Sequence, residues 1–109
     1  MAISHLAAGQ TLSVLPFGSA LANARTTALF KTEQLEVIQL VLAAGKSFPP
    51  HKVAGEITIQ CLEGSFEVTI EGAVQTLKAS QLMYLSGGVQ HGLTALEDAS
   101  ALVTIVLRR

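Results

Sequence analysis

The sequence predicts an all-β protein whose strands run antiparallel within a single domain. From residue 27 onward, short apolar runs alternate with turn signals, and several runs alternate between apolar and polar residues. The same part of the chain has no convincing helical periodicity. The 109 residues match the length of one domain with its own core. Many short strands separated by glycine turns are typical of a β-sandwich or a β-barrel.

The first strand is predicted at residues 35–42, which read LEVIQLVL, and two alanines followed by Gly45 end it. Before that strand, residues 19–24 are compatible with one helical turn and equally with a loop. No internal repeat, low-complexity run or linker divides the chain. We therefore expect every strand to belong to the same domain.

A second strand is predicted at residues 56–62, where Ile57, Ile59 and Cys61 would share one face. Cys61 is the only cysteine, so the chain has neither a disulfide framework nor a thiolate metal cluster. The sequence places no base near this thiol. We therefore interpret Cys61 as a small buried hydrophobic residue rather than a nucleophile.

The third strand shows the cleanest alternation, with Phe66, Val68 and Ile70 separated by polar residues. The acidic residues between them are typical of a solvated sheet face that resists aggregation. Glu71-Gly72 then turns the chain into residues 74–77, which predicts a β-hairpin. Three further strands are predicted at residues 81–85, 91–96 and 101–107.

Half of the residues are apolar and only 14% are charged, against about 25% charged in an average domain. This excess of apolar residues is larger than one small core needs, so we expect a homodimer that buries the outer face of one sheet. The apolar strand at residues 101–107 is the main candidate for that face. The net charge is −1 and the basic residues form no patch beyond Arg108 and Arg109, which argues against nucleic acid binding.

The N-terminal stretch LSVLPFGSALANA is similar to the apolar part of a secretory signal followed by small residues. It has no positively charged start, and Pro16 and Gly18 interrupt the apolar run. No run of 18 apolar residues exists that could span a membrane. We therefore expect a cytoplasmic protein.

Two segments of the chain space their glycines and histidines in a recognisable way. In the first, five residues separate Gly45 from His51, and Gly64 follows thirteen positions later, which resembles the first motif of the cupin family without a gap. Residues 80–95 match the second motif through Gly88 and His91. Fifteen residues separate the two motifs, as in the shortest microbial members. The resemblance covers residues 35–107 and implies an antiparallel jelly-roll β-barrel at residues 35–109, with residues 1–34 packing on it.

The resemblance also implies a metal site that has lost half of its ligands. Val53 and Ile57 stand where the family has its second histidine and its glutamate, so only His51 and His91 remain of the four usual ligands. A two-histidine site would hold a divalent transition metal weakly. Glu56 lies one position before the missing glutamate and would face outward on a regular strand. A β-bulge near Gly55 would be needed to turn it inward.

Two functions remain open. The first is a small-molecule-binding protein without turnover, in which His51 and His91 supply polar contacts inside the barrel. The second is a metal-dependent cupin enzyme of the oxygenase or isomerase type, or a metal-free variant in which the two imidazoles move a proton. The predicted pocket residues are His51, Val53, Ile57, Ile59, Cys61, Met83, Tyr84 and His91.

Overall fold

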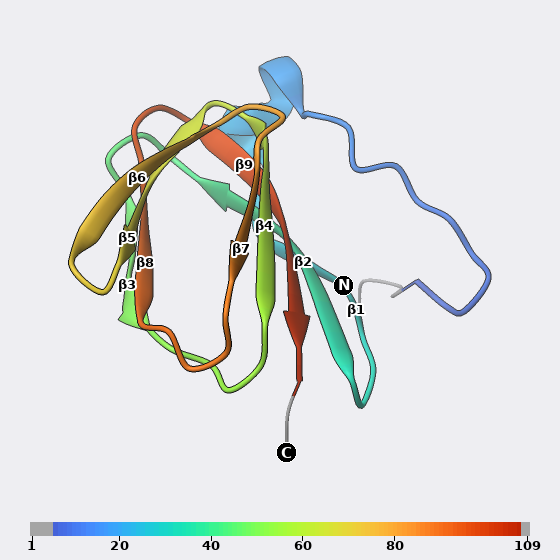
Figure 1. The fold of residues 1–109 in the computed structure, drawn as a ribbon. Helices are drawn as coiled ribbons and strands as arrows, with labels where there is room; N and C mark the ends of the chain where they lie inside the picture. The colour runs from blue at the N-terminus through green and yellow to red at the C-terminus, as the bar shows by residue number, and fades with distance from the viewer. Residues whose placement is uncertain (1–5, 108–109) are drawn as a thin grey trace.

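The computed structural model describes residues 6–107, apart from the side chains of Pro49 and His51. These residues form one short 3₁₀ helix and nine strands, all paired antiparallel (Figure 1). In chain order the elements are η1 Gly18–Asn23, β1 Thr27–Lys31, β2 Leu35–Leu42, β3 Ser47–His51, β4 Ile57–Glu63, β5 Ser65–Ile70, β6 Ala73–Lys78, β7 Leu82–Leu85, β8 His91–Ala95 and β9 Ala99–Val106.

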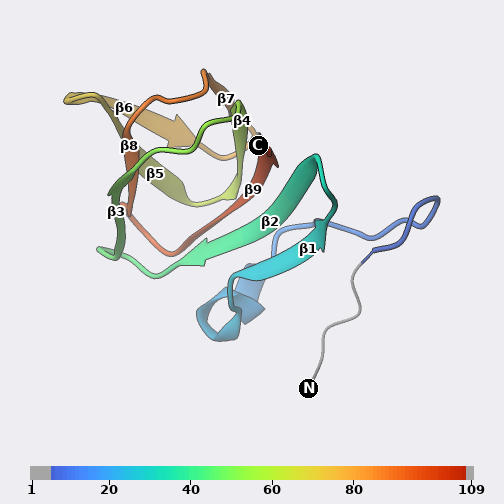
Figure 2. The ribbon, with the colours of Figure 1, turned by 90° about the horizontal axis from the view of Figure 1, so that it is seen from below.

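The strands form two sheets that face each other (Figure 2). The five-stranded sheet has the order β1-β2-β9-β4-β7, and the four-stranded sheet has the order β3-β8-β5-β6. The antiparallel all-β prediction is confirmed. Within the described residues, however, no strand ladder closes the two sheets into a barrel. One reason is that the edge strand β3 carries Pro49 and Pro50, which have no N–H to donate to a further strand.

The core lies between the sheets because alternate residues of each strand point inward. On β4, Ile57, Ile59 and Cys61 are buried while the residues between them are partly exposed, as the sequence predicts. On β5, Phe66 and Val68 are completely buried by the same alternation. The remaining buried apolar residues are Leu40, Leu77, Leu85, Leu93, Ala95, Ala99 and Ala101.

The predicted hairpin at Glu71-Gly72 is present. Ile70 pairs with Ala73 across a two-residue loop, and both loop residues have positive φ, 49° for Glu71 and 89° for Gly72. Two positive φ values are characteristic of the type I′ turn, whose twist matches that of the flanking strands. Gly72 adopts this conformation at little cost because it has no Cβ.

Residues before β2 contribute more than a covering segment, because β1 is an edge strand of the five-stranded sheet and pairs with β2. Residues 18–23 form a helical turn, which is one of the two alternatives that the sequence left open for residues 19–24. Upstream of η1 the chain loops away from the sheets (Figures 1 and 2) and returns at Leu6, whose N–H donates to the carbonyl oxygen of Leu29 in β1 at 3.0 Å. Among residues 6–107, no helix has the length and apolar character needed to cross a membrane.

Candidate functional site

A cavity of about 450 Å³ lies between the two sheets, and we call it the inter-sheet cavity. This volume is within the range of roughly 300–1,000 Å³ that is usual for small-molecule sites. Its walls come from β2, β3, β4, β8 and β9, together with the residue that precedes β1. The described lining residues are Thr26, Ile38, Leu40, Phe48, Pro50, Ile57, Ile59, His91, Leu93, Val103 and Ile105.

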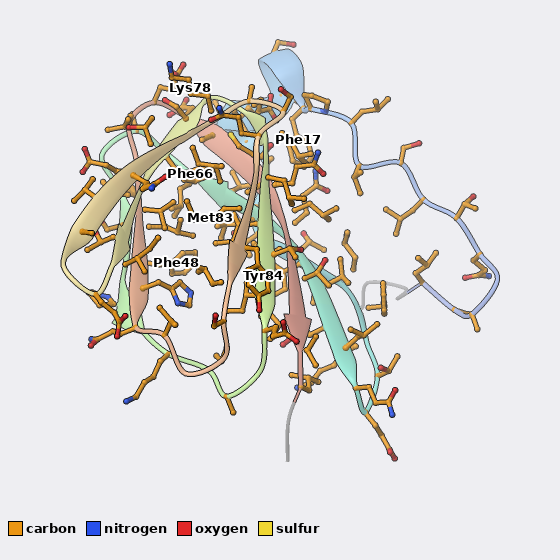
Figure 3. All side chains as sticks on the ribbon, viewed as in Figure 1. Phe17, Phe48, Phe66, Lys78, Met83 and Tyr84 are labelled. Carbon is orange, nitrogen blue, oxygen red and sulfur yellow. The ribbon has the colours of Figure 1, made fainter. Side chains whose placement is uncertain are left out.

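Strand alternation explains the apolar character of the cavity. On β9, Val103 and Ile105 point into it, and on β4, Ile57 and Ile59 do the same. The register pairs Ile57 with Ile105 and Ile59 with Val103, so these four side chains form one continuous wall. Figure 3 shows the ring of Phe48, from β3, between the sheets opposite this wall.

His91 is the first residue of β8 and is only 4% exposed. Its Nδ1 lies 3.1 Å from the carbonyl oxygen of Val89. A carbonyl oxygen only accepts hydrogen bonds, so Nδ1 carries a proton and donates it. In the neutral ring Nε2 is then an acceptor. The contact fixes both the tautomer and the orientation of the imidazole at the cavity wall.

Position 51 is the last residue of β3, and its backbone pairs directly with that of His91. Two chain positions forty residues apart are thus brought opposite each other by strand pairing. The register shifts between Phe48 and His51, where the two prolines interrupt the hydrogen-bond ladder. The side chain of His51 lies outside the described residues, so the predicted His51–His91 site is described only at its backbone and at the His91 imidazole.

The other predicted pocket residues occupy different surroundings. Val53 is half-buried and packs against the core, and its carbonyl accepts the N–H of Gly88 at 2.8 Å. Met83 also packs against the core, from β7. Cys61 is completely buried, and burial raises the pKa of its thiol to about 11. Its Sγ donates to the carbonyl oxygens of Glu63 and Gly64.

Tyr84 lies on the outer face of β7 and is 58% exposed (Figure 3). Its hydroxyl donates to Oε2 of Glu56 at 2.5 Å, and this hydrogen bond is the main cause that raises the pKa of Tyr84. Glu56 itself is exposed and precedes β4, which begins at Ile57. The carboxylate therefore lies on the outside of the sheet, as expected for a regular strand.

Most of the lining residues were not predicted from the sequence. Strand alternation could have identified Ile38 and Leu40, which share one face of the predicted first strand, and Val103 and Ile105 on the last one. The strand β3 was not predicted because proline is rare inside strands. Phe48 and Pro50 were missed for this reason. Thr26 reaches the cavity only because β1 joins the sheet edge.

The cupin-domain family matches residues 38–107 of the chain, which span both spaced motifs and β3 to β9. The chain belongs to the cupin family. Similar solved structures include a conserved protein of unknown function from Streptococcus pyogenes, with 20% identity and a TM-score of 0.76 over 100% of this chain and 99% of that chain. A cupin superfamily protein from Desulfitobacterium hafniense has 14% identity and a TM-score of 0.78 over 99% and 100%.

An RmlC-like cupin from Desulfovibrio desulfuricans has 25% identity and a TM-score of 0.70, with 94% of this chain and 97% of that chain covered. At such identities the likeness shows the cupin fold and leaves the ligand open. None of the curated proteins matches the chain.

The described donors at this site are fewer than a stable mononuclear metal centre needs. The described residues contain no group of three or more His, Cys, Asp and Glu side chains placed to hold an ion. Even with His51 added, the described residues would give a metal at His91 only two protein ligands, because Ile57 offers a hydrocarbon side chain. Glu56 is exposed and accepts the Tyr84 hydroxyl, so it does not replace the missing carboxylate.

Proposed function

We propose that this cupin binds a small molecule in the inter-sheet cavity without turning it over, with His51 and His91 as polar contacts. The observation that carries the proposal is the cavity of about 450 Å³ with a buried imidazole in its wall. Small β-barrels and sandwiches of this kind have room for about one small ligand. The pairing of position 51 with His91 supports a shared polar end of the site.

A small-fragment panel followed by NMR tests this function. Bound fragments are expected to shift the methyl signals of Ile59 and Val103, which line the cavity, and to leave those of Leu102 on the opposite face of β9 unchanged. The His91→Ala substitution should weaken polar fragments about tenfold, since one hydrogen bond of about 1.4 kcal/mol is lost. Shifts confined to outer-face methyls, or no shifts at all, would contradict the proposal.

The alternative is a metal-dependent cupin enzyme, and the retained histidines are the reason to test it. Elemental analysis of protein purified without chelators or a histidine tag separates the two functions. The binding proposal predicts a metal content far below one per chain. Near-stoichiometric transition metal that disappears in the His51→Ala, His91→Ala double variant would favour the enzyme, because only those two imidazoles could then hold the ion.

A further inference from the structure

The chemistry of the cavity wall restricts the class of ligand, and this inference rests on the proposed function. Nine of the eleven described lining residues are apolar, and none is Lys, Arg, Asp or Glu. A ligand that enters this space loses its water on the sides that face this wall. An ion transferred from water without a compensating partner costs far more free energy than a neutral group of the same size.

In the two polar lining residues, the Thr26 hydroxyl and the His91 Nδ1–H already donate to backbone carbonyl oxygens. Thr26 Oγ1 donates its proton to the carbonyl oxygen of Val41 at 3.2 Å and accepts the N–H of Val41 at 2.9 Å. His91 donates its Nδ1 proton to the carbonyl oxygen of Val89. A carboxylate needs hydrogen-bond donors to replace its water. The described wall therefore offers an anion no uncommitted hydroxyl or Nδ1 proton.

The backbone of the nearby edge strand adds to this shortage. Pro49 and the lining residue Pro50 lie in β3 and have no N–H group. In many anion sites, backbone N–H groups supply the donors when side chains do not. Strand β3, which contributes Phe48 and Pro50 to the cavity wall, lacks two backbone N–H groups in succession. A cation is equally disfavoured, since no carboxylate lines the described wall.

We propose that the inter-sheet cavity selects an uncharged, largely hydrocarbon molecule and rejects its carboxylate and ammonium analogues. The size is set by the cavity volume of about 450 Å³, roughly three times that of a cavity which takes up a single benzene. A bicyclic aromatic molecule or a terpenoid of similar bulk matches this space. Dispersion contacts with the wall formed by Ile59, Val103 and Ile105 provide most of the affinity.

Three naphthalene derivatives that differ only in their substituent test the inference. The hydroxymethyl compound is neutral, the carboxylate is an anion and the aminomethyl compound is a cation at pH 7. NMR titration of the full chain should give a dissociation constant for the neutral compound at least about tenfold lower than for either ion. Val103→Phe, which fills the cavity, should abolish binding, whereas the matched Val74→Phe on the exposed strand β6 should leave it unchanged.

A gain-of-function variant keeps the test decisive if Val103→Phe does not fold. Phe48 lines the cavity and is 37% exposed, so an arginine there can place its charge at the edge of the cavity while its stem covers apolar surface. The dissociation constant of the naphthalene carboxylate should be at least about tenfold lower for Phe48→Arg than for the unchanged protein, because the guanidinium group supplies the cation that the wall lacks.

The outcomes separate this inference from the proposed function. If the carboxylate or the ammonium compound binds as tightly as the neutral one, and Val103→Phe abolishes that binding, the cavity is a binding site but the ligand class is wrong. The same conclusion follows if Phe48→Arg leaves carboxylate binding unchanged. If none of the three compounds binds, or if binding survives in a folded Val103→Phe variant, both the inference and the proposed function fail.

Discussion

At the scale of single residues, Glu63 joins three parts of the chain through one carboxylate. Its Oε2 accepts the N–H of Phe17 at 2.8 Å and the hydroxyl of Ser100 at 2.6 Å, and its Oε1 accepts the N–H of Gly18 at 3.1 Å. Burial would raise the pKa of Glu63, but these hydrogen bonds stabilise the charged form and lower the pKa below its ordinary value of 4.5. The N-terminal segment is thereby fastened to β4 and β9.

This geometry predicts a loss of stability in acid. Because the folded pKa of Glu63 is lowered, its contribution to stability is present above pH 4.5 and is lost as the pH falls through the folded value. Thermal unfolding followed from pH 7 to pH 3 should show a smaller drop in melting temperature for Glu63→Gln than for the unchanged protein. Glu67→Gln on β5 is the control and should keep the original pH dependence. Identical profiles for Glu63→Gln and the unchanged protein would contradict this role.

At the scale of elements, the approach to β4 is packed directly against the end of β9. The N–H of Val106 donates to the carbonyl oxygen of Glu56 at 2.9 Å. Gly55 is buried and lies against Val106. A Cβ at position 55 would lie 1.6 Å from the carbonyl oxygen of Val106. The segment that leads from β3 into the cavity wall therefore depends on a glycine at this position.

Gly55→Ala is expected to lower the free energy of unfolding by about 3 kcal/mol, because two backbone segments must move apart. That loss corresponds to a fall in melting temperature of roughly 12 °C or more for a domain of this size. Gly72→Asn is the matched control: its position has open space around it and a positive φ that asparagine tolerates, so the loss should stay below about 1 kcal/mol. Differential scanning calorimetry checks both values, and equal effects would contradict the packing argument.

At the scale of the whole molecule, the outer face of the five-stranded sheet carries exposed apolar side chains among polar ones, with Leu82 and Tyr84 on β7 the most exposed. Leu102 on β9 is half-buried there, beside Thr104 at the next outward position. β9 lies in the middle of its sheet, between β2 and β4, so this face is flanked by strands on both sides. We propose that a second copy of the chain covers it, because an interface would remove these exposed apolar side chains from water.

Leu102→Glu should then convert a dimer into monomers or aggregates, because a charge would be placed where the partner copy excludes water. Gel filtration with light scattering measures the change directly. Thr76→Glu on the exposed face of β6 is the control and should leave the elution volume unchanged. An unchanged elution volume and melting temperature for Leu102→Glu would count against this interface.

The sequence alone predicted seven of the nine described strands, all but β1 and β3. Alternation placed Ile57, Ile59 and Cys61 on one buried face, and Glu71-Gly72 predicted the hairpin, because both features depend only on neighbours along the chain. The spacing of His51 and His91 pointed to the cupin family before any contact was known. A strand with two prolines gave no such signal, so β3 and its cavity residues Phe48 and Pro50 were not predicted.

Tertiary structure decided which of the inward residues border open space and which fill the core. Cys61 and Ile59 share one face of β4, yet Cys61 is completely buried in the core while Ile59 lines the cavity. Alternation assigns a side to each residue but carries no information about the separation of the facing sheets. That separation depends on contacts between distant strands, such as β3 with β8 and β4 with β9. The apolar cavity and its size are therefore properties of the assembled sheets.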